Sequence, residues 1–206
     1  MTRVVLISGG LWEDVGTEQF WRRPGIVAGL LAAGFEVVTP PRPDRPLSWS
    51  QEVEYVGRAL TADPVTIIAG SNGCSVAAGL ASAYPDRVAK LLLAWPATAG
   101  DPGVDERARS RLLRQEASPD VVCALLAGDT LRGHTDRQLS TLRMEVGVLP
   151  SIPDNPAHQR RTVDALLRVL PRVQELPGCP ESPRPQFAVH LRSFLGTVVN
   201  FVLGGS

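Results

Sequence analysis

Lysine is nearly absent from this chain, because Lys90 is the only lysine among the 21 basic residues of a 206-residue sequence. A Walker-type phosphate loop and a Schiff base both need a lysine, so neither is expected unless Lys90 serves. Cysteine is also scarce, and Cys74, Cys123 and Cys179 fit neither a disulfide framework nor a paired Cys-x-x-Cys zinc site. The three histidines lack the spacing of a metal-ligand set. We therefore expect no metal and no cofactor.

The sequence has no net charge, with 21 acidic and 21 basic residues. A nucleic-acid or anionic-membrane surface needs a basic excess, so neither partner is expected. No apolar run reaches the roughly 18 residues of a membrane span, and the first residues lack a signal-peptide layout. We expect a cytoplasmic protein that binds a small-molecule substrate, and a homodimer is left open.

Short apolar strands alternate with helical segments along most of the chain, which predicts a doubly wound α/β sheet of about six mainly parallel strands in a single domain, 1–206. The alternation lapses between 97 and 142, where helical patches predict a short insert or lid. Strands are predicted at 4–7, 35–38, 66–69, 90–94, 145–150 and 172–176.

The segment Ala69-Gly70-Ser71-Asn72-Gly73 joins a predicted strand to a helix of small residues. Small residues two positions before and after the serine suit a tight turn that holds Ser71 in a strained conformation at the carboxyl edge of the sheet. The Asn72 backbone N–H would then point at a developing oxyanion. The alternative is an ordinary glycine-containing turn, including one that cradles a phosphate, although the dinucleotide fingerprint G-x-G-x-x-G is missing.

The chain resembles the α/β-hydrolase superfamily along most of its length. Ser8-Gly9-Gly10-Leu11-Trp12 resembles the family's oxyanion loop, and the segment around Ser71 resembles its nucleophile elbow, with Ala69 in place of the first glycine. The run Ala83-Tyr84-Pro85-Asp86-Arg87-Val88 resembles the family's passage into the next strand. The resemblance implies that Ser71 is a nucleophile and that Asn72, with Gly10 or Leu11, supplies the oxyanion-hole amides.

The family's triad follows the chain order serine, acid, histidine. Asp154, in the loop after the strand at 145–150, is the expected acid, although an aspartate before Pro156 is also typical of a helix cap or turn. Asp101 and Asp129 are weaker substitutes.

His190 is the only histidine beyond the last predicted strand, so it is the expected base. It also lies beside the apolar stripe of the final helix and could simply pack there. His158 follows Asp154 by four residues and is the competing candidate for the base. As a base it would break the usual order, so the expected role is a pocket or capping residue, with the base role left as the alternative. His134 lies in the predicted insert and is expected to be exposed.

Trp12 and Trp95 each follow a predicted strand, so with His158 they are expected to line a substrate pocket, although both could also be core residues. Cys74 is expected to be a packing residue. Because no charged pocket is evident, we predict a serine hydrolase that cleaves a carboxylic ester or thioester of a small apolar or aromatic substrate. The alternative is a biosynthetic cyclase, lyase or acyltransferase of the same fold, or a catalytically silent ligand-binding protein, since no histidine follows Gly178 directly.

Overall fold

The computed structural model describes residues 2–12 and 15–204 and contains one sheet of six parallel strands. Strand order across the sheet is β2-β1-β3-β4-β5-β6, so each of the last three strands lies beside the strand that precedes it in the chain. The predicted parallel α/β sheet is confirmed. The strands are β1 (Arg3–Ile7), β2 (Glu36–Val38), β3 (Val65–Gly70), β4 (Val88–Ala94), β5 (Glu145–Leu149) and β6 (Val173–Glu175).

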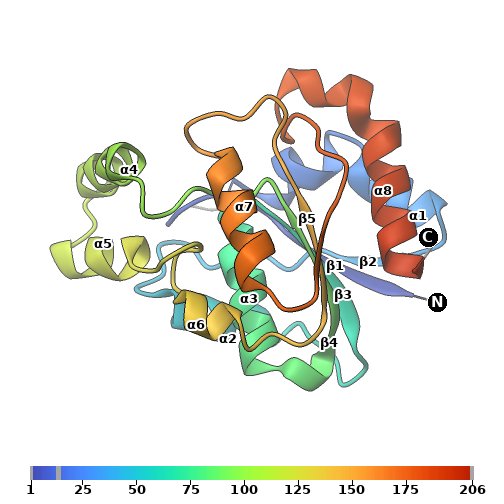
Figure 1. The fold of residues 1–206 in the computed structure, drawn as a ribbon, viewed down its shortest axis with the longest axis horizontal. Helices are drawn as coiled ribbons and strands as arrows, with labels where there is room; N and C mark the ends of the chain where they lie inside the picture. The colour runs from blue at the N-terminus through green and yellow to red at the C-terminus, as the bar shows by residue number, and fades with distance from the viewer. Residues whose placement is uncertain (1, 13–14, 205–206) are drawn as a thin grey trace.

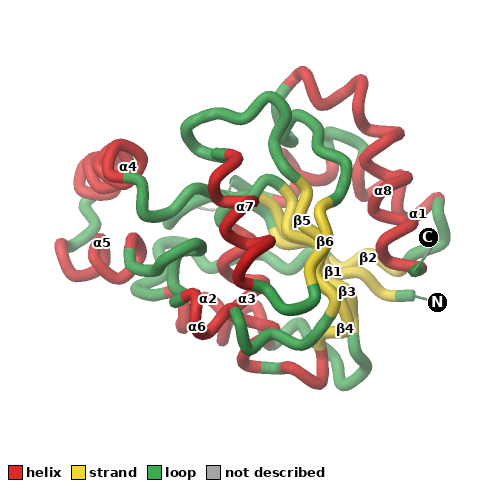
Figure 2. The backbone as a smooth tube through the Cα atoms, viewed as in Figure 1, coloured by secondary structure: helices red, strands yellow, loops and turns green. Residues whose placement is uncertain are grey.

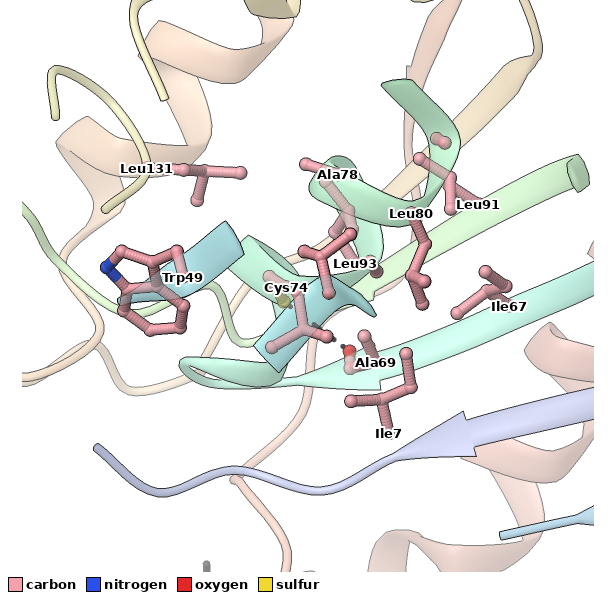
Figure 3. Packing of buried hydrophobic residues seen from close by; sticks show 14 of the residues in the cluster. Ile7, Trp49, Ile67, Ala69, Cys74, Ala78, Leu80, Leu91, Leu93 and Leu131 are labelled. Atoms are coloured by element: carbon pink, nitrogen blue, oxygen red, sulfur yellow. Dashed lines mark hydrogen bonds between the residues drawn. The ribbon is translucent and has the colours of Figure 1, made fainter. Parts of the chain in front are cut away.

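Helices cover both faces of the sheet, which is why the central strand β3 is buried along its whole length. Figures 1 and 2 show α1 (Ile26–Ala32) and α8 (Leu191–Leu203) together on one face. The other face carries α2 (Trp49–Gly57), α3 (Gly73–Ala83) and α7 (Arg160–Val169), which share one apolar core. Figure 3 shows part of that core, in which side chains of α3 pack on β3 and β4.

Three helices occupy the segment for which an insert is predicted: α4 (Pro102–Arg114), α5 (Pro119–Leu126) and α6 (Asp136–Leu139). Each begins at a residue whose side chain accepts a backbone N–H of the first helical turn. These capping residues are Asp101 for α4, Ser118 for α5 and Thr135 for α6. In Figure 1, α4 and α5 lie to the left of the sheet, on the side towards which the strands run. This placement puts α4 beside the carboxyl ends of the strands.

The last helical segment, Pro185–Leu203, joins a 3₁₀ turn (Pro185–His190) to α8. By length and composition alone it could cross a membrane, a test that core helices also pass. In this fold Phe187, Phe194 and Val198 are buried in the core between α1 and the sheet. The segment therefore serves as a packed helix of the α/β fold.

Candidate active site

Ser71 lies in the tight turn between β3 and α3 and has a left-handed backbone conformation, with φ of 54°. Such a conformation is strained for a residue with a side chain and is typical of functional sites. The turn can form because Gly73 has no side chain: a Cβ there would lie 2.5 Å from the Ser8 carbonyl oxygen. The predicted elbow geometry is therefore present, with Ser71 just before the amino terminus of α3.

His158 places its imidazole against the Ser71 hydroxyl, with 3.1 Å between Nε2 and Oγ. It lies in the loop between β5 and α7, and only 13% of its side chain is exposed. Thr98 forms hydrogen bonds with the residues on both sides of His158. The Thr98 N–H donates to the Ala157 carbonyl at 2.8 Å, and the Thr98 hydroxyl accepts the Gln159 N–H at 2.8 Å. The histidine is thus fixed next to the serine.

Glu181, in the loop after β6, lies on the far side of that imidazole, with 2.7 Å between its Oε1 and His158 Nδ1. Asn155 Nδ2 donates to the same oxygen, and Arg184 Nε lies 3.1 Å from Oε2. Burial raises the pKa of this carboxyl, but hydrogen bonds from His158, its own backbone N–H and Asn155 outweigh burial and lower the pKa to about 2. The carboxylate is therefore ionised near neutral pH and can only accept a hydrogen bond.

These contacts fix the direction of the hydrogen bonds through the imidazole. Because the ionised Glu181 only accepts, Nδ1 of a neutral His158 carries the proton and Nε2 has the free lone pair. That lone pair faces the Ser71 hydroxyl at 3.1 Å. The three residues have the relative geometry of a nucleophile, a general base and an orienting acid.

The structure corrects the sequence assignment of the base, because His158 and not His190 contacts Ser71. His190 ends the 3₁₀ turn before α8 and is only partly buried. After Glu181 the chain is tied to the segment before α1, because the Ser182 hydroxyl donates to the Phe20 carbonyl at 2.6 Å. His190 consequently lies at the start of α8 on the α1 face of the sheet.

The assignment of the acid is corrected in the same way, because Glu181 and not Asp154 contacts the imidazole. Asp154 is exposed, and its Oδ2 accepts the N–H of Arg160, the first residue of α7, at 3.3 Å. It has the helix-capping role that was the alternative interpretation. Asp101 caps α4, and Asp129 accepts the N–H of Asp136, so neither substitute orients the histidine.

His134 is buried rather than exposed, with its Nε2 2.7 Å from the Ser75 carbonyl. Burial lowers its pKa, although the hydrogen bond to Ser75 raises it. Cys74 is fully buried behind the elbow, where its thiol contacts the Ala69 carbonyl at 3.5 Å (Figure 3). Burial raises the pKa of this thiol, so the prediction that Cys74 is a packing residue rather than a nucleophile is confirmed.

The predicted oxyanion amides lie on the two segments that flank Ser71. Leu11 and Asn72 line the same cavity as the serine, and in the described part of the chain neither of their backbone N–H groups has an acceptor. Gly10 turns the chain before Leu11 with φ of 109°, a conformation that favours glycine. These amides are therefore available to a bound oxyanion.

A buried arginine that no sequence motif indicates holds the loop that carries Gly10. Arg42 donates from Nη1 to the carbonyls of Ser8, Gly9 and Gly10 at 3.1, 2.8 and 3.0 Å. Its Nε pairs with Glu52 of α2, and the two side chains are 3% and 1% exposed. The N–H of a trans peptide points opposite to its C=O, so the amides that follow these three carbonyls face away from Arg42.

We expect Glu52→Gln to destabilise the protein by about 3 kcal/mol, because it leaves the Arg42 charge buried without a counter-charge. Glu54→Gln is the matched control on the same helix, since Glu54 pairs with Arg58 at the surface and both side chains are 70% exposed. Surface pairs contribute about 1 kcal/mol at most. Urea unfolding measures both; equal losses in the two variants would contradict this account of the loop.

The cavity beside Ser71 has a volume of about 440 Å³. Besides Leu11 and Asn72 it is lined by four arginines: Arg107, Arg111, Arg132 and Arg184. The expectation of an apolar substrate depended on the absence of a charged pocket, and this lining contradicts that premise. The sequence does not indicate this cluster of arginines, because its members come from three separate segments of the chain.

Neither tryptophan lines this cavity, so the expected substrate contacts of Trp12 and Trp95 are corrected. Trp95 is fully buried, donates from Nε1 to the Cys179 carbonyl at 3.0 Å and stacks on Phe194 with 5.3 Å between ring centroids. Trp12 is 7% exposed and belongs to the core on the opposite face, where Arg45 lies 5.0 Å from its ring. Both are core residues, the alternative considered for them.

In the described ranges, 2–12 and 15–204, no three His, Cys, Asp or Glu side chains cluster in a way that could hold a metal ion. The buried carboxylates at the site are committed to His158 and to Arg42.

No protein-family model and no curated protein matches this sequence. Solved structures do match over nearly the whole chain. A protein described as a candidate non-haem bromoperoxidase of Mycobacterium tuberculosis superposes with a TM-score of 0.76 at 14% identity, covering 100% of this chain and 93% of that one.

Two further structures are similar. An α/β-hydrolase enzyme from a metagenome of Mar Chica lagoon sediments gives a TM-score of 0.71 at 16% identity, covering 98% of this chain and 91% of its own. The meta-cleavage product hydrolase of Pseudomonas fluorescens gives 0.68 at 18% identity, covering 100% and 92%. The chain thus has the α/β-hydrolase fold, as its sequence predicts.

Proposed function

We propose that this protein is a serine hydrolase that cleaves a carboxylic ester or thioester with Ser71, His158 and Glu181. The observation that carries the proposal is the continuous hydrogen-bond chain from Glu181 through His158 to the Ser71 hydroxyl, at 2.7 and 3.1 Å. A serine hydroxyl is a weak nucleophile unless an adjacent base takes its proton, and this geometry provides such a base.

In the proposed reaction Ser71 Oγ attacks the substrate carbonyl carbon while His158 Nε2 takes the hydroxyl proton. The carbonyl oxygen becomes an oxyanion that accepts the N–H groups of Asn72 and of Gly10 or Leu11. His158 then gives its proton to the departing alcohol or thiol, which leaves an acyl group on Ser71. A water that loses a proton to His158 then attacks the carbonyl carbon of this acyl group. The bond from that carbon to Ser71 Oγ breaks, His158 returns the proton to Oγ, and the carboxylic acid leaves.

Glu181 orients the imidazole and stabilises the imidazolium that forms in each half of the reaction. The acid and base have exchanged loops relative to the usual order of this fold, since the histidine follows β5 and the acid follows β6. The two loops lie side by side, because Ile152 N–H donates to the Cys179 carbonyl at 3.2 Å and Cys179 N–H donates to the Pro150 carbonyl at 3.3 Å. A histidine from the loop after β5 or from the loop after β6 can therefore reach the Ser71 hydroxyl.

The exchange also removes the main support for a silent ligand-binding protein or a non-hydrolytic enzyme. That alternative depended on the missing histidine after Gly178. His158 of the neighbouring loop occupies the position of a base, so the serine is not left without one.

The proposal predicts an acyl-enzyme on Ser71. Turnover of 4-nitrophenyl acetate is quenched with acid within the first turnovers, and the digested protein is mapped by mass spectrometry. We expect the acetyl group on the peptide that contains Ser71, and none on protein unfolded in urea before mixing. An acetyl group on another residue, or no turnover of any ester, would contradict the proposal.

A further inference from the structure

We infer that the substrate carries a carboxylate or a phosphate a few bonds from its scissile carbonyl, and that Arg107 and Arg111 bind this anion. The inference rests on the proposed hydrolase function and names its substrate class. Both arginines lie on α4 at i and i+4, so they share one helix face, and both line the 440 Å³ cavity that contains Ser71.

Among the described residues, the arginines that line the cavity outnumber the carboxylates paired with them. Arg132 is paired with Asp105 at 2.9 Å and Arg184 with Glu181 at 3.1 Å. Within residues 2–12 and 15–204, Arg107 and Arg111 have no carboxylate within ion-pair distance. These two guanidinium groups therefore leave the cavity with a positive charge next to the nucleophile.

Arg132 forms the buried wall of this cation cluster. Its side chain is 4% exposed, it donates from Nη1 to Asn72 Oδ1 at 2.9 Å, and its Nε has no partner in the described structure. Burial and the nearby Arg111 charge both lower its pKa. Two cations close enough to repel one another in this way are stabilised when an anion lies between them.

Guanidinium groups recognise carboxylate and phosphate through paired N–H donors. The hydroxyl of Ser71, the Asn72 amide and the arginines line the same cavity, so a small acyl compound can present its carbonyl to the serine and its anion to α4. The Arg111 guanidinium is only weakly engaged, since its one hydrogen bond in the described structure is to the Leu11 carbonyl at 3.4 Å. It is thus free to bind a ligand.

The test compares three esters that differ only at the end of the acyl chain: mono-4-nitrophenyl glutarate, 4-nitrophenyl 4-phosphonobutanoate and 4-nitrophenyl pentanoate. We expect kcat/KM for at least one anionic ester to exceed that for the neutral pentanoate by about tenfold or more, with a difference that shrinks as salt rises. The better of the two anionic esters identifies the carboxylate or the phosphate as the natural group.

Arg107→Gln and Arg111→Gln should each lower kcat/KM for the preferred anionic ester by about tenfold, chiefly through KM. The losses should be several-fold smaller for pentanoate, which has no anion for these arginines to bind. Arg114→Gln is the matched control, because Arg114 is an exposed residue at the end of α4 that does not line the cavity. Equal or faster hydrolysis of the neutral ester, or equal losses for all esters, would overturn the inference.

A binding measurement separates this inference from the proposed chemistry. In the Ser71→Ala protein, calorimetry with monomethyl glutarate and inorganic phosphate should detect binding that is lost on adding Arg107→Gln. Binding without any ester turnover by the wild type would refute the hydrolase and keep the anion site. Turnover through Ser71 with no anion binding would refute only the anion site.

Discussion

Replacing His158 with alanine is expected to lower kcat/KM for ester hydrolysis by about 10²–10⁴-fold. Within residues 2–12 and 15–204 the imidazole is the only titratable side chain hydrogen-bonded to the Ser71 hydroxyl, so its removal leaves an unactivated serine. The effect should appear mainly in kcat, because the side chain acts in the transition state rather than in substrate binding.

His190→Ala is the matched control for this variant. His190 lies at the start of α8, so its loss should leave kcat/KM within about twofold. Steady-state kinetics on one neutral ester suffice. If His190→Ala removed activity while His158→Ala kept it, the usual order of this fold would hold and the present assignment would be wrong.

Glu181→Gln is the second large effect, with kcat expected to fall by about 10²–10⁴-fold. A glutamine amide can donate a hydrogen bond to Nδ1, which favours the tautomer with the proton on Nε2. That tautomer cannot accept the Ser71 proton. Asp154→Asn changes an exposed residue that accepts the first N–H of α7, and it should leave kcat within about twofold. The opposite ranking would contradict the role of Glu181.

The same variant has a pH signature in stability. The pKa of Glu181 is lowered from 4.5 to about 2 in the folded protein, so its ionised form stabilises the fold fully above pH 4.5. This contribution is lost as pH falls from 4.5 towards 2. Urea unfolding should therefore show a difference between wild type and Glu181→Gln that is larger at pH 7 than at pH 3.

Much of this architecture could be predicted because it depends on local pattern. Apolar runs such as Thr66-Ile67-Ile68-Ala69 suit only strands that are buried on both faces, and all six predicted strands are present. The position of Ser71 followed from sterics as well, because the tight turn after β3 leaves no room for a side chain at Gly73.

The acid and base could not be assigned from sequence, because either of two loops can supply the histidine while the other supplies the acid. β5 and β6 are neighbours, so their loops are equivalent in reach, and the chain order of the family decided the prediction instead. Glu181 lies three residues after Gly178, where the family's base was expected. A glutamate shortly after the last strand, together with a histidine in the loop after β5, was the available signal that the acid and the base had exchanged loops.

The cavity arginines were missed for a different reason. Arg107 and Arg111 belong to an exposed helix whose charged pattern is typical of a solvated surface. Only the packing of α4 beyond the carboxyl edge of the sheet brings them next to Ser71. The pattern of charges along α4 does not indicate that the Ser71 turn lies beside this helix in the fold.

The most direct test of the exchanged triad is the intact mass of the protein after treatment with a fluorophosphonate, which labels activated serines. The account predicts one adduct on the wild type and on His190→Ala, and none on Ser71→Ala or His158→Ala over the same time. An adduct that survives His158→Ala but disappears in His190→Ala would contradict it.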